Sequence, residues 1–197
     1  MRATIEWNHS TICLTGIEST PRIRPARQPQ RSLRATIQQL PADVRWALCD
    51  IAASDNGVVI AQALRDGTAV AVSDGSFKDK FGTAAWVIEG RRADGRLEGQ
   101  CIIPGGPEDQ SAYRSELGGL YAIAAMVQVI CELHNIQEGS IEVACDGMNA
   151  LAQVGEADPI IRPNGAQYDI IAATQAKIKW TNIQWKMRHV MGHQDDT

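Results

Sequence analysis

The sequence predicts an α/β fold: a mixed five-stranded sheet flanked by helices, preceded by a small helical lead-in. Three observations lead to this prediction. Three β-like runs follow one another from Thr68 with short connections, a long apolar segment without proline comes next, and the remaining strand patterns alternate with helical ones. Strands that are joined through helices usually run parallel. The sheet should therefore hold three antiparallel strands and then two strands parallel to the first.

The elements can be assigned in chain order. Runs rich in Val, Ile and Ala predict the first three strands, and Asp94 with Gly95 forms a dipeptide that hairpin turns favour. Ser111 opens the Ala- and Leu-rich segment that predicts the longest helix, and the last strand alternates apolar with polar residues. The expected strands are 68–73, 83–88, 97–103, 141–145 and 183–190, and the expected helices are 111–134, 148–154 and 165–179.

The first 67 residues predict a separate N-terminal segment, 1–67, ahead of a main domain, 68–197. One strand containing Trp7 is expected near the start, and residues 21–34 combine prolines with arginines. This stretch is interpreted as a solvated linker, with a phosphate-binding arm as the alternative. Short helices are expected after Pro41 and over 58–64.

Composition limits the class of protein. A chain of 197 residues with 44% hydrophobic residues is typical of a soluble protein with one main domain. The five cysteines form no CxxC pair, which argues against a zinc knuckle or a disulfide framework and favours a reducing compartment, cytoplasmic or nuclear. We expect no membrane association, because no stretch resembles a leader or a run of about 20 apolar residues.

Charge is distributed unevenly along the chain. Residues 1–70 hold 8 Lys and Arg against 6 Asp and Glu, whereas residues 71–197 hold 11 against 17. The second part is therefore acidic. Because affinity for nucleic acid rests on phosphate neutralisation by basic side chains, this balance argues against strong autonomous binding and fits a site that gathers carboxylates.

Three carboxylates stand at the ends or in the first turns of expected elements. Asp74 follows the first strand, Glu116 lies early in the longest helix, and Asp146 follows the fourth strand. The two aspartates should emerge at the carboxyl edge of neighbouring parallel strands, where open α/β sheets place their sites. Oxygen ligands suit Mg²⁺ or Mn²⁺ better than zinc. The alternative for each residue is a solvated surface acid.

Four segments of this part of the chain resemble the type-1 ribonuclease H domain, in the form carried by reverse transcriptases of retroelements. They are SDGSFKDKFGTAAWVI, SAYRSELGGLYAI, CDGMNAL and HVMGHQDD, and the resemblance runs from about Thr68 to Thr197. It implies the ribonuclease H-like fold, cleavage of the RNA strand of an RNA–DNA hybrid with two Mg²⁺ or Mn²⁺ ions, and a retrotransposon polyprotein with a polymerase domain as a partner. Shape and the 2′-OH would select the substrate.

The resemblance also implies roles for individual residues. Asp74, Glu116 and Asp146 would be catalytic metal ligands, and His193 a catalytic histidine that helps proton transfer and product release. The substrate-binding residues that it implies are Gly75, Ser76 and Arg114.

The sequence also departs from the family's pattern. Ala112 and Tyr113 replace small amide residues, and Gly147 replaces a frequent serine. The family's fourth acidic ligand normally follows the Gly-His pair by ten or more residues. We therefore expect a domain that lacks its last helix, and Asp195 and Asp196 are poorly placed to substitute. The alternative function is a catalytically inactive ribonuclease H-like module that positions nucleic acid or a partner.

Overall fold

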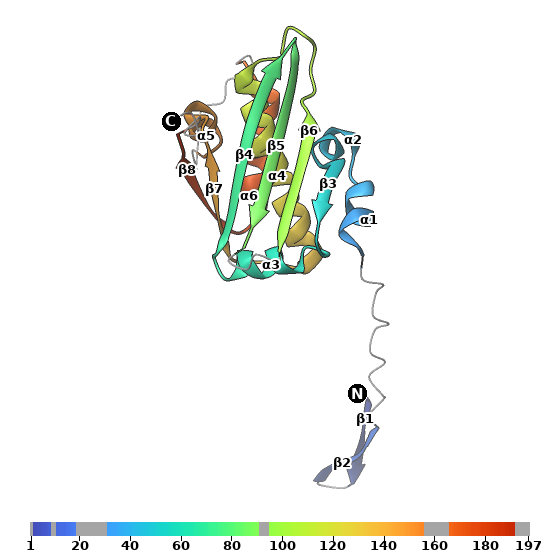
Figure 1. Cartoon of the computed structure of the whole chain (residues 1–197). Coiled ribbons are helices and arrows are strands. Elements are labelled where there is room, and N and C mark those ends of the chain that lie inside the picture. The colour runs from blue at the N-terminus through green and yellow to red at the C-terminus, as the bar shows by residue number, and fades with distance from the viewer. Residues whose placement is uncertain (1, 9–10, 19–30, 91–94, 156–165, 192–197) are drawn as a thin grey trace. The chain divides into compact units, whose positions relative to one another are not determined.

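The computed structural model describes residues 2–8, 11–18, 31–90, 95–155 and 166–191 (Figure 1). The chain divides into two compact units, Met1–Gln30 and Arg31–Thr197. In the first unit, β1 (Arg2–Asn8) and β2 (Thr11–Glu18) pair in antiparallel fashion. The sequence predicted one strand here, whereas the unit contains a two-stranded hairpin.

The second unit is built on one six-stranded sheet. Its strand order is β3-β6-β5-β4-β7-β8, in which the first three pairings are antiparallel and the last two are parallel. This confirms the predicted fold class, three antiparallel strands followed by two parallel ones, and adds one edge strand. The strands are β3 (Asp50–Ala53), β4 (Ala69–Lys78), β5 (Phe81–Glu89), β6 (Arg96–Ile102), β7 (Ser140–Cys145) and β8 (Gln184–His189).

The β4–β5 hairpin is longer than the sequence predicted. Lys78 pairs with Phe81, so Asp79 and Lys80 alone form the turn, with φ of 51° and 66°. Positive φ at both central residues gives the backbone twist that two-residue hairpins need. The turn therefore lets β4 continue five residues beyond Ser73, where the sequence pattern had placed its end.

The helices cover one face of this sheet, and in Figure 1 α4 and α6 lie behind it. Ser111 caps α4 by accepting a hydrogen bond from the Arg114 backbone N–H, and Asn135 ends the helix in the left-handed conformation. The helical elements are α1 (Leu33–Gln38), α2 (Ala42–Arg45), a 3₁₀ turn (Trp46–Leu48), α3 (Val58–Arg65), α4 (Ala112–His134), α5 (Met148–Gly155) and α6 (Tyr168–Trp180).

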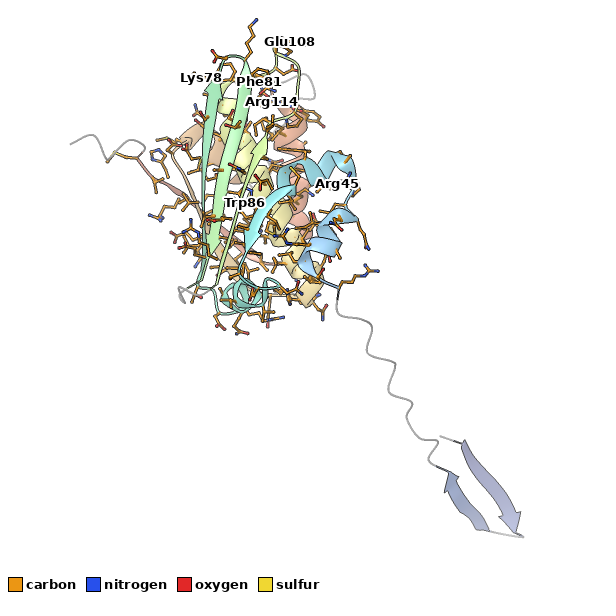
Figure 2. The ribbon with its side chains drawn as sticks, turned by 45° about the vertical axis from the view of Figure 1, so that its right-hand side comes forward. Arg45, Lys78, Phe81, Trp86, Glu108 and Arg114 are labelled. Carbon is orange, nitrogen blue, oxygen red and sulfur yellow. The ribbon has the colours of Figure 1, made fainter. Side chains whose placement is uncertain are left out.

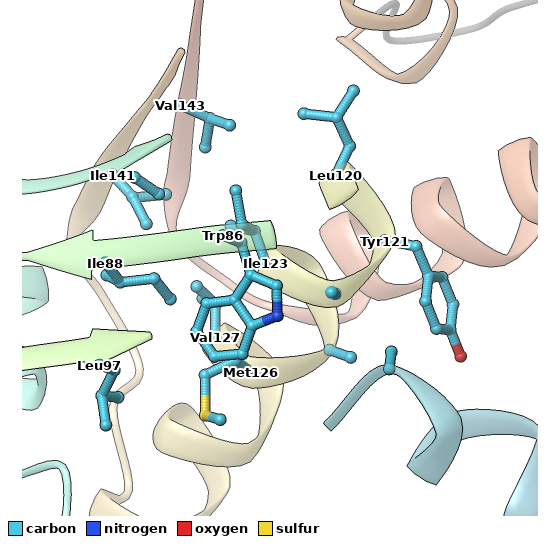
Figure 3. Close-up of a cluster of buried hydrophobic side chains, with 14 of the residues drawn as sticks. Trp86, Ile88, Leu97, Leu120, Tyr121, Ile123, Met126, Val127, Ile141 and Val143 are labelled. Atoms are coloured by element: carbon cyan, nitrogen blue, oxygen red, sulfur yellow. The ribbon is translucent and has the colours of Figure 1, made fainter. Parts of the chain in front are cut away.

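The core lies between the sheet and α4. Alternate residues of β5, Trp86 and Ile88 among them, are buried toward the helices, and Ile123, Met126 and Val127 of α4 are buried in the same cluster (Figure 3). Alternation along the strand buries one face, while the other face of β4, β5 and β6 stays exposed. The second face is called the open face below.

Helix α4 is long and apolar enough, by length and composition, to cross a membrane, which the sequence reading had not recognised. However, 78% of its apolar window is buried inside the structure. Its apolar surface is thus used in the core, as in the central helix of a soluble protein.

Residues 31–67 belong to the main unit, so the compact unit begins at Arg31 and not at residue 68 as predicted. Leu33, Leu48 and Leu64 are buried in the same core as α4. Strand β3, which falls where the sequence suggested only helix, pairs with β6 and closes that edge of the sheet. The sequence could not show this packing because short helices bury their apolar residues only against partners distant in the chain.

A chain that begins at Arg31 should unfold cooperatively in urea, whereas one that begins at residue 68 should lose cooperative unfolding. The shorter chain lacks the three buried leucines and the edge strand β3, which pairs with β6. Loss of one buried leucine side chain alone typically lowers the free energy of unfolding by about 2–5 kcal/mol. Urea titration followed by circular dichroism tests this. In the full chain, Leu48→Ala should be strongly destabilising and Val58→Ala, at an exposed position, nearly neutral. Equal stability of the two truncated chains would contradict the boundary at Arg31.

Candidate carboxylate site

Asp74 and Asp146 stand at the same level of two neighbouring strands. The parallel pairing of β4 with β7 ends at Val72 and Ala144. Asp74 lies two residues further along β4, and Asp146 lies two residues further along the chain, just past the end of β7. Because side chains alternate with a period of two along a strand, the Asp74 carboxylate lies on the open face. Asp74 itself lies inside β4 and pairs with Ala85 of β5, so it marks the end of the pairing with β7 and not the end of the strand.

Glu116 reaches these aspartates because two glycines leave room for it. A Cβ on Gly75 would overlap the backbone of Ser115 and Glu116, so α4 lies directly against β4 at this point. A Cβ on Gly147 would overlap the Glu116 carboxylate itself. Glu116 therefore contacts the residue after Asp74 and the residue after Asp146. The three predicted acids come from three distant segments and lie near one another where the pairing of β4 with β7 ends.

The carboxylates repel one another electrostatically. Partial burial raises the pKa of Glu116 above its usual range, and the charges of Asp146 and then Asp74 raise it further. Among the described residues, none of these three acids has an ion-pair partner. Within the described part of the chain, the site is therefore a concentration of negative charge without a paired basic side chain.

The donor chemistry of this site fits a hard divalent cation, because all three side chains offer carboxylate oxygens. The coordination sphere is not formed, however: within the described ranges, no three His, Cys, Asp or Glu side chains are gathered closely enough to hold one ion. The acids interact electrostatically but are not gathered around one point. The predicted metal-ligand roles of Asp74, Glu116 and Asp146 thus stay predictions.

A hollow of about 490 Å³ opens on the open face beside Asp74. Its lining includes the hydroxyl-bearing Ser76 and Thr83, and a hydrogen bond of 2.6 Å from Gln100 Nε2 to Asp50 Oδ2 lies along its wall. Burial, and secondarily the proximity of Cys49, raises the pKa of the Cys101 thiol to about 12. The Cys101 thiol is therefore protonated at neutral pH, which argues against Cys101 as a thiolate nucleophile.

Arg114, for which substrate binding was predicted, has its guanidinium engaged inside the protein. Only 5% of its side chain is exposed. It donates to both oxygens of Asp169 at 3.0 and 2.6 Å, to the Pro104 carbonyl at 2.9 Å and to the side chain of Gln167. It ties the first turn of α4 to α6 and to the segment after β6. Its substrate role stays a prediction, as do those of Gly75 and Ser76.

The catalytic histidine predicted from the sequence, His193, lies outside the described residues, and so do Asp195 and Asp196. The structure identifies another histidine beside the acids. His189 of β8 pairs with Cys145, and its Nε2 donates to the backbone carbonyl of Asp146 at 3.0 Å. In the sequence, only one pattern pointed to His189: it lies two positions beyond Met187 in the alternating strand.

Comparisons with known proteins bear on the fold alone. No protein-family model matches this sequence, and no curated protein is significantly similar to it. Solved structures with a similar fold include the N-terminal RNase H domain of a Mycobacterium tuberculosis protein, with 14% identity over 63% of this chain and 82% of that one and a TM-score of 0.43.

Two RNase H1 structures resemble this chain to the same degree. The enzyme of Halobacterium salinarum is 17% identical over 63% of this chain and 86% of its own, with a TM-score of 0.42. LC11-RNase H1, solved in complex with an RNA/DNA hybrid, is 11% identical over the same shares, with a TM-score of 0.45. Similarity at this level does not establish a function, so the function of this chain has to be argued from its own residues.

Gly75→Ala should destabilise the protein by about 1–3 kcal/mol, because the new methyl group meets the α4 backbone, which cannot turn aside as a side chain can. Gly147→Ala should cost less, since the Glu116 side chain can rotate away. Urea unfolding measures both, with the exposed Ser76→Ala as the control. A Gly75→Ala variant as stable as the parent would show that α4 does not depend on this close approach.

Asp169→Asn should lower the free energy of unfolding by about 1 kcal/mol at pH 7, because Asp169 is largely exposed and its pairing is screened. The hydrogen bonds from Arg114 hold the pKa of Asp169 below its usual range. The pairing therefore stabilises the fold above the unfolded pKa of about 3.9 and is lost as pH falls through the lower folded pKa.

Urea unfolding of parent and variant at pH 7 and at acid pH should show the difference shrinking as the solution becomes acidic. Asp79→Asn, at the exposed β4–β5 turn, is a matched control that should have little effect at either pH. A difference that stays constant with pH would assign the effect of Asp169 to packing and not to charge.

Proposed function

We propose that this chain is a metal-dependent nuclease that cleaves the RNA strand of RNA–DNA hybrids. The observation that carries the proposal is that Asp74, Glu116 and Asp146 lie close enough to interact electrostatically. The two aspartates each stand two residues beyond the last β4–β7 pair, and Gly75 and Gly147 leave room for Glu116 beside them. Their mutual repulsion favours a bound cation, because a cation would neutralise charges that no described basic side chain balances.

The three carboxylates would hold two Mg²⁺ or Mn²⁺ ions, whose chemistry is to activate a water molecule and to stabilise charge on the scissile phosphate. The chain's own residues have the other tasks. Gly75 and Gly147 hold Glu116 against the aspartates, and His189 fixes the backbone at Asp146. His193 is proposed as the histidine that moves a proton near the leaving group, and Gly75, Ser76 and Arg114 as substrate-binding residues.

The hollow beside Asp74 offers a place for a nucleic-acid strand. Ser76 and Thr83 both line it, and their hydroxyls can donate to phosphate or exchange hydrogen bonds with a 2′-OH. The 2′-OH is the group by which a protein distinguishes RNA from DNA at a given position. This chemistry supports an RNA strand as the one placed next to Asp74.

A second candidate is a catalytically inactive module of the same fold that positions nucleic acid or a partner. It is favoured by one observation: in the described part of the chain, the acids are not gathered around a single point. The difference between the two candidates is whether the carboxylates turn toward a cation when one is supplied.

The biological context is proposed from the sequence resemblance alone. It would be a retrotransposon polyprotein, with a reverse-transcriptase polymerase domain as the partner. A cytoplasmic or nuclear location is consistent with the described cysteines, Cys49, Cys101, Cys131 and Cys145, which are all free thiols.

Asp74→Asn, Glu116→Gln and Asp146→Asn should each lower the rate of RNA cleavage in a labelled hybrid by orders of magnitude while the circular dichroism spectrum stays that of the parent. Each change removes one negative charge and one carboxylate oxygen from the cation site. Asp66→Asn is the matched control, because Asp66 is an exposed carboxylate at the end of α3 and does not line this hollow. The control should cleave at nearly the parental rate.

Calorimetric titration with Mg²⁺ and Mn²⁺ gives a readout that does not depend on activity. The parent should bind the ions, and the three variants should bind them more weakly. A parent that binds metal and hybrid without cleaving the RNA would favour the inactive module. Unchanged cleavage in Asp74→Asn would refute the carboxylate mechanism.

A further inference from the structure

The end of the β4–β5 hairpin projects beyond the strands on either side of it. Pairing of β4 with β7 ends at Val72, and the last pair between β5 and β6 joins Thr83 to Ile102. Beyond Thr83, β4 and β5 form ladder pairs only with each other, up to the turn at Asp79 and Lys80 (Figure 2), while the Gly82 carbonyl still accepts a hydrogen bond from the Ile103 backbone N–H. The hairpin segment 74–85, called the ribbon below, begins at the proposed catalytic Asp74, and its residues 83–85 also pair with β6.

The open face of the ribbon carries a regular series of side chains. Directly opposite pairs in an antiparallel ladder share a face, and every second pair returns to it. Starting from Asp74 opposite Ala85, the next pair on this face is Ser76 with Thr83, and the one after it is Lys78 with Phe81. Moving outward, the face therefore presents a carboxylate, then two hydroxyls, then a cation beside an aromatic ring.

The outermost pair is unusually available for binding. The Phe81 side chain is 69% exposed, and Ile102, next to Thr83 on β6, is 70% exposed. Single exposed apolar residues are ordinary, but here two lie on adjoining strands beside a cation. In the described ranges, the side chains of Lys78 and Lys80 form no ion pair or hydrogen bond.

We propose that Lys78 and Phe81 form a nucleic-acid contact that holds the substrate strand as it runs from the ribbon tip to Asp74. Lys78 would pair with a phosphate and Phe81 would pack against the base or sugar of a nearby nucleotide, a combination that proteins use to follow a strand without reading its sequence. The proposal rests on the proposed function, because it assumes that the strand reaches Asp74.

The spacing along the ribbon fits a strand lying on it. Lys78 is four residues from Asp74, which is roughly 13 Å at about 3.4 Å per strand residue. Nucleotides rise about 3.4 Å each along one strand of a duplex, so the tip would contact a nucleotide about four positions from the one at Asp74. The hydroxyls of Ser76 and Thr83 lie between these two points.

Charge favours nucleic acid over a protein partner at this tip. The turn sequence Lys78-Asp79-Lys80 is net positive in a chain whose net charge is −4. A polyanion gains from two unpaired lysines and tolerates one aspartate, which can turn toward solvent. An apolar protein partner would instead have to desolvate both lysines, which costs free energy unless they are paired.

The test measures hybrid affinity by fluorescence anisotropy in Mg²⁺, in an Asp146→Asn background that blocks cleavage. Phe81→Ala should weaken binding about tenfold, and Phe81→Tyr should restore it while Phe81→Leu should not. Lys78→Ala should weaken binding and lower the slope of log affinity against log salt by about one. Trp180→Ala is the matched control, an exposed aromatic near the start of β8, the end of that strand away from Asp146.

The outcomes separate this proposal from the proposed function. If Phe81→Ala and Lys78→Ala bind the hybrid as tightly as the background does, the tip contact is refuted even if the parent cleaves. If both variants lose affinity but the parent never cleaves, the tip contact stands and the nuclease function falls. If the background binds neither hybrid nor single-stranded RNA or DNA, both are refuted.

Discussion

The close approach of α4 to the β4–β5 hairpin is the constraint on which the rest of this structure depends. A helix normally stands off a sheet by the length of its side chains, but here Gly75 lets the α4 backbone touch β4. Further along α4, Gly119 lies against Ser73 and Gly118 against Ile103. These small residues form one edge of the helix. They let Glu116 lie near the point where the parallel pairing of β4 with β7 ends, and a larger side chain at any of these positions would hold the helix away.

The two faces of the sheet have different uses. The helix-covered face holds Trp86 and Ile88 against α4 and accounts for most of the buried apolar surface. The open face holds Asp74 and the hollow beside it, and it leads out to Phe81. Because alternation separates these faces residue by residue, mutations that change binding on one face need not disturb packing on the other.

Two features support the structure around the site. Arg114 uses its guanidinium to join α4, α6 and the loop after β6, which fixes the helix end that carries Glu116. Strand β3, from the segment that the sequence had set apart as a lead-in, completes the sheet edge and contributes Asp50 to the hollow. The segment 31–67 is thus part of the same folded body as the acids.

The sequence by itself determined the succession of the five strands from β4 to β8, the long helix from Ser111 and the positions of three candidate acids, because alternation, helical periodicity and capping are local patterns. It did not determine that β4 runs past Asp74, that β3 joins the sheet, or that Arg114 is turned inward. Strand pairing, burial and ion pairing depend on residues far apart in the chain. Asp169 is 55 positions from Arg114, and only the folded structure brings such partners together.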